Sequence, residues 1–335
     1  MNINHFVSGY IPSPEDPRNY TLESIGVPVA YGAQTWGEIS ATYTSPVYNQ
    51  GQFGMCLDFT FGSIVEAIEE SQRKIKFPLA NGFLYGNRAT TDYKGEGLVP
   101  IEALKNLTKL GIPRKSVFNV YGDYPTCAAA VSSNLGNLDG EGLPQRPRGY
   151  VQLNGIEAIY TYIKKFQVPV FIGLVLTESF WNIGTNGIVP APAGAIVGGH
   201  AMQIIGIKKF PDRYRLKIQN QWGTEWGDHG YCYLDINEHP GKMELWGIIP
   251  QSADVMINRP QTLFLRLKSN VVFVDDKQVT WPMGPVYVGD KTMVPVREIC
   301  EVIGAKVVWY RGVDGNDMVI ITFAGEQAQK DVLGI

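Results

Sequence analysis

The sequence predicts an α+β protein, because patterns typical of helices dominate its first half and patterns typical of strands dominate its second half. Between residues 56 and 75, apolar residues recur at spacings of three and four, which indicates a helix. From residue 168 onward, short apolar runs alternate with Gly, Pro and Asp turns, which indicates strands. The chain has 335 residues, enough for two ordinary domains. We therefore expect two lobes with a cleft between them, followed by a smaller β-rich unit.

Composition and charge argue against several classes of protein. Apolar residues make up 44% of the chain and charged residues 18%, which is typical of a chain with a sizeable core. The net charge is −3, so the sequence offers no basic surplus for binding nucleic acid. No apolar run is long enough for a membrane span, and the first residues lack the pattern of a signal peptide.

The first half is expected to contain an extended segment, a tight turn and helices. Residues 1–44 are rich in Pro, Gly, Ser and Thr and predict extended chain on the surface of a domain. A Gly-rich turn follows at residues 49–54. Helices are expected over residues 56–75, 101–110 and 156–166. Residues 119–150 contain many Gly, Pro and Asn and predict a long loop.

The second half predicts strands and ends in a separate small unit. The first strands are expected over residues 168–176, 201–207, 215–219 and 230–236. The pattern then becomes β-β-α-β, with strands over residues 262–267, 271–274, 286–288, 293–296, 306–309 and 318–323 and a helix over 296–303. The predicted organisation is an N-terminal segment (1–44) packed on a main domain (45–258), followed by an accessory domain (259–335).

The cysteines and histidines give no sign of a metal or a disulfide framework. The chain has four of each. The cysteines are Cys56, Cys127, Cys232 and Cys300. They lie far apart without a CxxC pair, and the histidines form no HExxH motif, so we expect neither a metal nor another cofactor.

Cys56 is the best candidate nucleophile. A free cysteine is most often a small buried hydrophobe. Cys56, however, follows a Gly-rich turn directly and falls in the first turn of a predicted helix. The partial positive charge of a helix N-terminus favours the thiolate, which is the reactive form. A backbone N–H at the same place can also hold an oxyanion.

His200 is the best placed histidine to act as the base that a thiol nucleophile needs. It lies at the start of an apolar strand, whereas the other histidines lie near the chain end or in turn-like contexts. Taken alone, His200 would be interpreted as a core residue. Asn220, at the end of another predicted strand, can fix the tautomer of the imidazole, and Trp222 can shield that bond from water.

Four segments in this order resemble the papain family of cysteine peptidases. They are residues 45–56 (SPVYNQGQFGMC), 103–112 (ALKNLTKLGI), 199–201 (GHA) and 220–231 (NQWGTEWGDHGY). Residues 9–20 also resemble the opening of bacterial members. The resemblance extends over about residues 9–250. It implies a papain-like two-lobed fold, with a helical lobe, a β-rich lobe and an active-site cleft between them.

The resemblance implies a role for each candidate residue. Cys56 would be the nucleophile, His200 its acid/base partner and Asn220 the residue that orients His200. Trp222 would cover that contact. Gln50 would donate to the oxyanion together with the backbone N–H of Cys56. The implied function is that of a cysteine endopeptidase, which hydrolyses a polypeptide substrate through an acyl-thioester.

The resemblance also assigns substrate-binding residues. They are Gly54, Gly97, Leu98, Pro100, Gly198 and Gly199. Gly199 stands where some relatives carry an acidic residue, and no charge is evident in this wall. We therefore expect an apolar residue at the second position before the cleaved bond.

The sequence departs from the family pattern around the nucleophile. The departures are Phe53 for Cys, Met55 for a small residue, Leu57 for Trp, Asp58 for Ala and Gln221 for Ser. The charge of Asp58, close to the thiol, can alter its reactivity. The family's usual long inhibitory prosegment is not expected, because only residues 1–44 precede the core.

The C-terminal segment resembles the small domain named after the N-terminus of copper amine oxidases. The resemblance is carried by residues 293–309 (MVPVREICEVIGAKVVW). It implies an interaction or spacer module and nothing about copper. Because bacteria append this module to surface or secreted proteins, it suggests a bacterial or bacteriophage source and a secreted, surface or virion-associated location. The missing signal peptide and disulfide framework point to the inside of the cell instead, so the sequence leaves the location open. A protein or cell-surface partner would bind through residues 259–335.

The alternative function is that of a catalytically silent papain-fold protein used for binding or assembly, for example a phage or cell-surface structural component. A silent scaffold has no need of Gln50, Cys56, His200 and Asn220 together. Their joint presence favours the peptidase.

Overall fold

The computed structural model describes residues 8–17, 19–32, 35–88, 95–138, 140–235 and 244–253, and seven strands beyond residue 253. The chain divides into two compact units, Met1–Ile257 and Asn258–Ile335. Helices and an antiparallel sheet make up the first unit, so the α+β prediction is confirmed.

The helices of the first unit follow the apolar pattern of the sequence. They are α1 (Cys56–Arg73), α2 (Phe83–Gly86), α3 (Pro100–Leu110), α4 (Tyr124–Leu138) and α5 (Gly155–Phe166), with short 3₁₀ turns at Glu23–Ile25, Leu143–Gln145 and Glu178–Asn182. Helix α1 is almost entirely buried, and its Phe61 stacks on Phe171 with ring centroids 4.8 Å apart. Helix α3 begins with Pro100, and after its last residue the chain is capped by Gly111, whose φ of 68° favours glycine.

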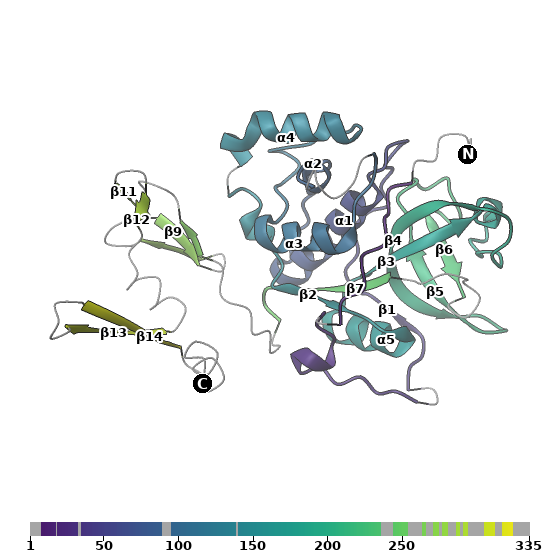
Figure 1. Ribbon diagram of the computed structural model, residues 1–335. Helices are drawn as coiled ribbons and strands as arrows, with labels where there is room; N and C mark the ends of the chain where they lie inside the picture. The colour runs from purple at the N-terminus through teal and green to yellow at the C-terminus, as the bar shows by residue number, and fades with distance from the viewer. Residues whose placement is uncertain are drawn as a thin grey trace. The chain divides into compact units, whose positions relative to one another are not determined.

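The strands of the first unit form one antiparallel sheet. They are β1 (Ile39–Ser40), β2 (Gly149–Gln152), β3 (Val170–Thr177), β4 (Ile196–Lys209), β5 (Tyr214–Gln219), β6 (Tyr231–Leu234) and β7 (Glu244–Ile249). Their order is β2-β7-β3-β4-β5-β6, and β1 pairs with the far part of β4. In Figure 1, helices α1 to α4 lie to one side of strands β3 to β6, and the N-terminal chain runs between the two groups.

One prediction about the first unit is wrong. The expected loop over residues 119–150 contains helix α4 and the start of strand β2, because the alanine-rich centre of α4 supports a helix despite the Gly and Asn residues around it. The N-terminal segment, which was expected as extended chain packed on the main domain, contributes side chains to the core of that domain. Its side chains Tyr10, Leu22 and Ile25 are buried in the core, with at most 3% of their surface exposed.

The described part of the second unit is made of short antiparallel pairs. Its strands are β8 (Leu263–Leu265), β9 (Val271–Val274), β10 (Lys277–Thr280), β11 (Val286–Val288), β12 (Lys291–Met293), β13 (Ala305–Arg311) and β14 (Asp317–Phe323). They pair as β10-β9-β8, β11-β12 and β13-β14. The helix expected over residues 296–303, with Cys300, lies outside the described residues.

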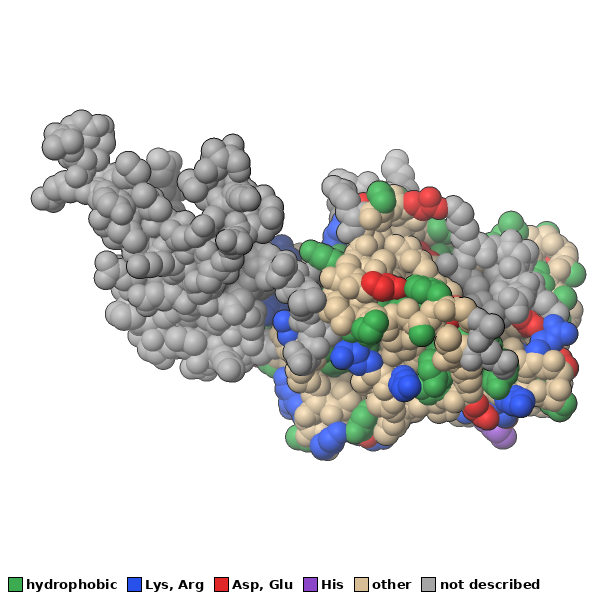
Figure 2. Space-filling view, turned by 90° about the horizontal axis from the view of Figure 1, so that it is seen from below, with side chains coloured by type: hydrophobic (Ala, Val, Ile, Leu, Met, Phe, Trp, Pro, Cys, Tyr) green, Lys and Arg blue, Asp and Glu red, His purple; other side chains and the backbone are tan. Residues whose placement is uncertain are grey.

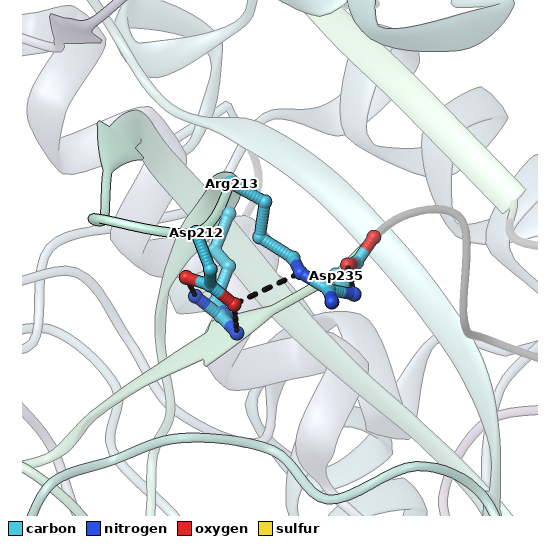
Figure 3. A network of polar contacts seen from close by, with 4 residues as sticks. Asp212, Arg213 and Asp235 are labelled. Carbon is cyan, nitrogen blue, oxygen red and sulfur yellow. Dashed lines mark hydrogen bonds and ion pairs between the residues drawn. The ribbon is translucent and has the colours of Figure 1, made fainter.

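Charged side chains on the first unit are largely paired or interspersed. An ion-pair network joins the turn between β4 and β5 to the end of β6, where Arg213 contacts Asp212 at 3.0 Å and Asp235 at 2.7 Å (Figure 3). On the face shown in Figure 2, the described acidic and basic side chains alternate with apolar ones. Within the described residues, no helix combines the length and apolarity needed to cross a membrane.

Candidate active site

Cys56 begins helix α1 and is fully buried. Burial raises the pKa of its thiol to about 12, although backbone N–H groups of Ala201, Leu57, Cys56 and Gly9 act in the opposite direction. The N–H of Ala201 belongs to strand β4 and adjoins His200. The Cys56 thiol at the start of α1 therefore lies against the strand that carries His200.

His200 and Asn220 form the second part of the site. His200 lies in β4 opposite Leu174, and Asn220 follows the last residue of β5. The imidazole Nε2 lies 2.8 Å from Asn220 Oδ1, which also accepts the Gln221 N–H at 2.8 Å. Because that oxygen is an acceptor, Nε2 must carry the proton, and Nδ1 keeps the lone pair that a base needs.

Aromatic rings surround the His200–Asn220 pair. Trp222 stacks on the imidazole with ring centroids 4.5 Å apart and an interplanar angle of 27°. Trp181 stacks on Trp222 in turn, at 5.5 Å. Burial among these groups lowers the pKa of His200 to about 4, while the bond to Asn220 acts in the opposite direction. A cavity of about 350 Å³ lies beside the rings, lined partly by Trp181, Trp222 and Trp226.

Two glutamines join the loops of the site. The Gln50 backbone N–H donates to the Gln221 carbonyl at 2.9 Å, which holds the turn before α1 against the loop after β5. The Gln50 Nε2 donates to the Phe53 carbonyl at 2.9 Å, and its second hydrogen stays available for an oxyanion. The Gln221 Nε2 donates to the carbonyls of Cys56 at 3.2 Å and Ala201 at 2.6 Å. The sequence indicated Gln221 only as a departure from the family pattern, where Ser is usual. In the structure its side chain joins the start of α1 to strand β4.

The departures around Cys56 are packed into the core. Met55 and Leu57 are fully buried. Asp58 faces helix α2, where its carboxylate accepts the N–H groups of Gly82 at 2.8 Å and Tyr85 at 3.0 Å. Burial raises the pKa of Asp58 to about 6, against the effect of these donors. Asp58 therefore holds α2 in place, a role that the sequence did not indicate.

A segment of the chain itself crosses the site. Residues Ser8–Ser13, which we call the strap, hydrogen-bond to both sides of the cleft. Leu98 N donates to Gly9 O at 3.0 Å and Ile11 N donates to Leu98 O at 3.1 Å, so the strap pairs in parallel with Leu98. On the other side, Gly199 N donates to Ser8 Oγ at 2.8 Å. Figure 1 shows this part of the chain passing between helices and sheet.

The strap covers the thiol at close range. A Cβ placed on Gly9 would lie 2.6 Å from Cys56 Sγ and 2.6 Å from Gly54 O. Gly97 faces Gly9 from the opposite wall, where its own Cβ would lie 3.0 Å from the Gly9 carbonyl. Only glycine at residue 9 lets the strap come this close, and the strap in turn shields Cys56 from solvent.

The side chain of Tyr10 fills a pocket beside the strap. A Cβ on Gly173 would lie 2.4 Å from the Tyr10 ring, and one on Gly199 would lie 2.8 Å from it. These glycines of β3 and β4 therefore leave the space that the ring occupies. The Tyr10 hydroxyl donates to Glu244 Oε2 at 3.0 Å. We call this site, lined by Gly173, Gly199 and Glu244, the Tyr10 pocket.

The predicted substrate-binding residues divide into two groups. Gly54, Gly97, Leu98 and Gly199 contact the strap, whereas Pro100 begins helix α3 and Gly198 precedes Gly199 in β4 with a φ of 143°. The expectation that no charge lies in this wall is wrong. Glu244 reaches it from strand β7, which is distant in sequence and was not predicted as a strand.

Comparisons with known proteins identify the family and the fold of the first unit. The family model described as "Papain family cysteine protease" matches residues 33–247, and the model described as "Copper amine oxidase N-terminal domain" matches residues 250–317. The fold resembles that of xylellain, a cysteine protease from Xylella fastidiosa, with a TM-score of 0.58 and 18% identity over 73% of this chain and 96% of that one.

Curated relatives match over part of their length. Cysteine proteinase 1 of Dictyostelium discoideum is 23% identical over 62% of this chain and 61% of its own length. Caricain of Carica papaya is 28% identical over 55% of this chain and 50% of its own. The chain thus spans half to two thirds of these relatives. The expected bacterial or bacteriophage source stays a prediction.

Proposed function

Because the chain belongs to the papain family of cysteine proteases, we propose that it is an endopeptidase that hydrolyses peptide bonds through an acyl-thioester on Cys56. The observation that carries the proposal is the pairing of His200 Nε2 with Asn220 Oδ1 beneath Trp222, on the strand whose next N–H points at the Cys56 sulfur. This arrangement provides a nucleophile, a base in a defined tautomer and a residue that orients it.

In the proposed reaction, His200 Nδ1 takes the proton of the Cys56 thiol, and the thiolate attacks the carbonyl carbon of the scissile bond. The negative oxygen that forms would accept hydrogen bonds from the Cys56 N–H and Gln50 Nε2. The C–N bond then breaks, and the amine leaves with the proton from His200. Water, deprotonated by His200, hydrolyses the thioester and restores the thiol.

The strap must leave before a polypeptide can reach the sulfur, since Gly9 already occupies the space against Cys56. The described form is therefore a closed one. In it, burial holds the Cys56 pKa near 12 and the His200 pKa near 4, so both groups are neutral at pH 7. Opening the strap would rehydrate both and move the pKa values back toward their ordinary range.

A silent binding protein is the second candidate, and the occupied cleft is the observation that favours it. A reactive epoxysuccinyl probe separates the two functions. In the peptidase, a Gly9→Ala chain with a destabilised strap becomes labelled at Cys56 and cleaves unfolded polypeptides. Both activities disappear in Gly9→Ala/Cys56→Ala and in Gly9→Ala/His200→Ala. A folded Gly9→Ala protein whose Cys56 becomes alkylated by iodoacetamide, but which cleaves no polypeptide, would favour the silent protein.

For the accessory domain, we propose that residues 259–335 serve attachment to a protein or cell-surface partner and leave catalysis to residues 45–258. All candidate catalytic residues precede residue 259. A chain ending near residue 258 should keep its turnover rate on a small peptide. A soluble, folded but inactive truncated chain would contradict this division.

A further inference from the structure

A buried arginine binds the loop that the strap contacts. The wall loop, as we call residues 95–98, contains Leu98, whose N–H and carbonyl both bond to the strap. Arg88 follows helix α2 and keeps only 6% of its surface exposed. Its Nη1 donates to Gly97 O at 2.8 Å and its Nη2 donates to Gly95 O at 2.5 Å. One planar guanidinium therefore holds two carbonyls of the wall loop at a fixed spacing.

The side chains around Arg88 fix its position. Its guanidinium carbon lies 3.5 Å from the centre of the Tyr124 ring, in helix α4, and 5.8 Å from that of the Tyr85 ring. The Tyr85 hydroxyl accepts the Gly97 N–H at 3.0 Å and donates to Glu96 Oε2. Glu96 Oε1 in turn accepts the Tyr124 N–H at 3.3 Å. Helices α2 and α4 therefore both hold the wall loop.

Consecutive residues of the wall loop bond to different partners. The N–H and carbonyl of Gly97 bond to Tyr85 and Arg88, whereas those of Leu98 bond to the strap. Gly97 has a φ of 101°, and glycine gives the loop a conformational freedom that these contacts remove. Buried main-chain groups without partners are unfavourable. Without Tyr85 and Arg88, Gly97 would need new partners, and the loop would turn Leu98 away from the strap.

The position of the wall loop affects the nucleophile, because the two lie close together. A Cβ on Gly54, two residues before Cys56, would lie 3.3 Å from Gly97 N. A Cβ on Gly9, whose carbonyl bonds to Leu98, would lie 2.6 Å from Cys56 Sγ. Main chain that pairs with Leu98 therefore passes directly over the thiol. A shift of the wall loop changes how such a chain is placed against the sulfur.

We propose that Arg88 is a positioning residue, which holds the wall loop so that the Leu98 N–H and carbonyl pair with an extended main chain in the cleft. In the closed form that main chain is the strap, and in the open form it is the polypeptide substrate. The substrate half of this inference rests on the proposed peptidase function. Because pairing with Leu98 uses main-chain groups, Arg88 affects the cleavage of every polypeptide rather than the choice of one side chain.

The strap tests the inference without turnover, because a displaced wall loop holds the strap less often over the thiol. Three variants of the full chain would be compared. Arg88→Lys keeps the charge but loses the fork that binds two carbonyls, and Tyr85→Phe removes only the hydroxyl. Arg114→Lys is the matched control. The Arg114 guanidinium also lies over a ring, 4.4 Å from the centre of Phe77, but the residue is exposed.

The readout is the rate at which iodoacetamide alkylates Cys56, located by mass spectrometry, with thermal melting as a check of the fold. We expect the rate to rise about tenfold in Arg88→Lys, which corresponds to one hydrogen bond to a charged group, and to rise less in Tyr85→Phe. The Arg114→Lys control should stay within about twofold. Buried Cys232 should stay unmodified in every chain.

Two results of the alkylation experiment would overturn the proposal. One is an equal Cys56 rate in all folded chains. The other is a joint rise at Cys56 and Cys232, because it indicates general loosening of the fold rather than displacement of the strap. If Arg88→Lys does not fold, Tyr85→Phe decides by the same two criteria.

Cleavage in the Gly9→Ala background supplies the second arm. A peptide would be compared with p-nitrophenyl acetate, an ester small enough to acylate Cys56 without contacting the wall loop. Arg88→Lys should lower kcat/KM for the peptide by about tenfold. It should leave ester hydrolysis within about twofold. Equal losses on both substrates would show a general effect on Cys56 and overturn the positioning role.

The two arms separate this inference from the proposed function. Peptide cleavage that Arg88→Lys leaves unchanged would refute the positioning of substrate and leave the peptidase standing. The expected alkylation pattern without any peptide cleavage by the Gly9→Ala chain would refute the peptidase, and the positioning of the strap by Arg88 would stand.

Discussion

The candidate catalytic residue His200 and the Tyr10 pocket both adjoin strand β4, but their polar atoms are held in different ways. His200 is bound by Asn220 and covered by Trp222, all on one sheet and its loops. Glu244 Oε2 is bound only by strap donors among the described residues. None of the groups in the first arrangement belongs to the strap, so we expect it to keep its geometry when the strap leaves, as the proposed base requires. The second is complete only while the strap occupies the pocket.

The largest expected effect is the dependence of the Cys56 alkylation rate on pH. With a pKa raised to about 12 by burial, the thiolate fraction of the closed form rises with pH until that value is reached. Far below the pKa, each pH unit gives about a tenfold increase, so alkylation should be roughly a thousandfold faster at pH 10 than at pH 7. Mass spectrometry can follow Cys56 separately from buried Cys127 and Cys232.

The same pH profile measured on Gly9→Ala shows how far the strap, when closed, raises the pKa of Cys56. More frequent opening should lower the apparent pKa of Cys56 toward that of an ordinary thiol, about 8.5, so the rate should level off at a lower pH than in the unmodified chain. The neutral His200 of the closed form, with a pKa near 4, predicts no inflection at pH 6 to 7 in the unmodified chain. A closed form with a plateau from pH 7 upward would show that the thiolate already exists under the strap.

A substitution at Gln50 tests the part of the candidate site that does not belong to the strap. Gln50→Ala removes one donor to the oxyanion and should lower kcat by about 10²–10³-fold with the Gly9→Ala strap open. Gln52→Ala is the matched control, because Gln52 lies in the same turn with its side chain exposed. If the two variants cleave peptide equally fast, Gln50 has only the structural role seen in its bond to Phe53.

A substitution at Asp58 tests whether this departure from the family pattern affects the stability of the fold rather than the reactivity of Cys56. Asp58→Ala leaves the N–H groups of Gly82 and Tyr85 unsatisfied inside the protein, and should lower the free energy of unfolding by about 2–4 kcal/mol. Urea denaturation measures this change. The alkylation rate of Cys56 at pH 7 should stay within about threefold in variants that remain folded.

The raised pKa of Asp58 predicts how its contribution to the free energy of unfolding changes with pH. The folded protein holds the Asp58 proton more tightly than the unfolded chain, since burial raises the pKa to about 6 from 3.8. This group's contribution to stability is therefore complete below pH 3.8 and decreases as pH rises toward 6. Asp58→Asn should remove this component from the pH profile of unfolding. An unchanged profile would mean that Asp58 titrates normally.

Gly9→Ala has the smallest expected effect, and it tests directly whether the strap covers Cys56. The added methyl group would lie 2.6 Å from Cys56 Sγ, so the strap must shift away. We expect Cys56 alkylation to rise about tenfold, equivalent to about 1.4 kcal/mol in the opening equilibrium. Gly37→Ala is the control, because a Cβ there meets no atom within 4 Å. Equal rates in the two variants would contradict a closed strap.

Much of the fold could be predicted because its signals are local. The spacing of apolar residues identified helices α1, α3 and α5, and alternating runs identified β3 to β6. Strand β7 and helix α4 were missed. The first carries a Glu at its start and follows a polar stretch, and the second mixes Ala with Gly, Ser and Asn. Such segments take their structure from burial against neighbours, which a single sequence does not display.

By itself, the sequence determined which groups are the candidates for the chemistry, because the motifs around Cys56, His200 and Asn220 predict each residue at a helix start or in or next to a strand. Only the tertiary structure decided what surrounds them. The strap, the Tyr10 pocket and the Glu244 carboxylate come from segments more than 230 residues apart, joined by a 3.0 Å hydrogen bond between Tyr10 and Glu244. Contacts of that range depend on how strands pack beside one another, and no local pattern in the chain encodes them.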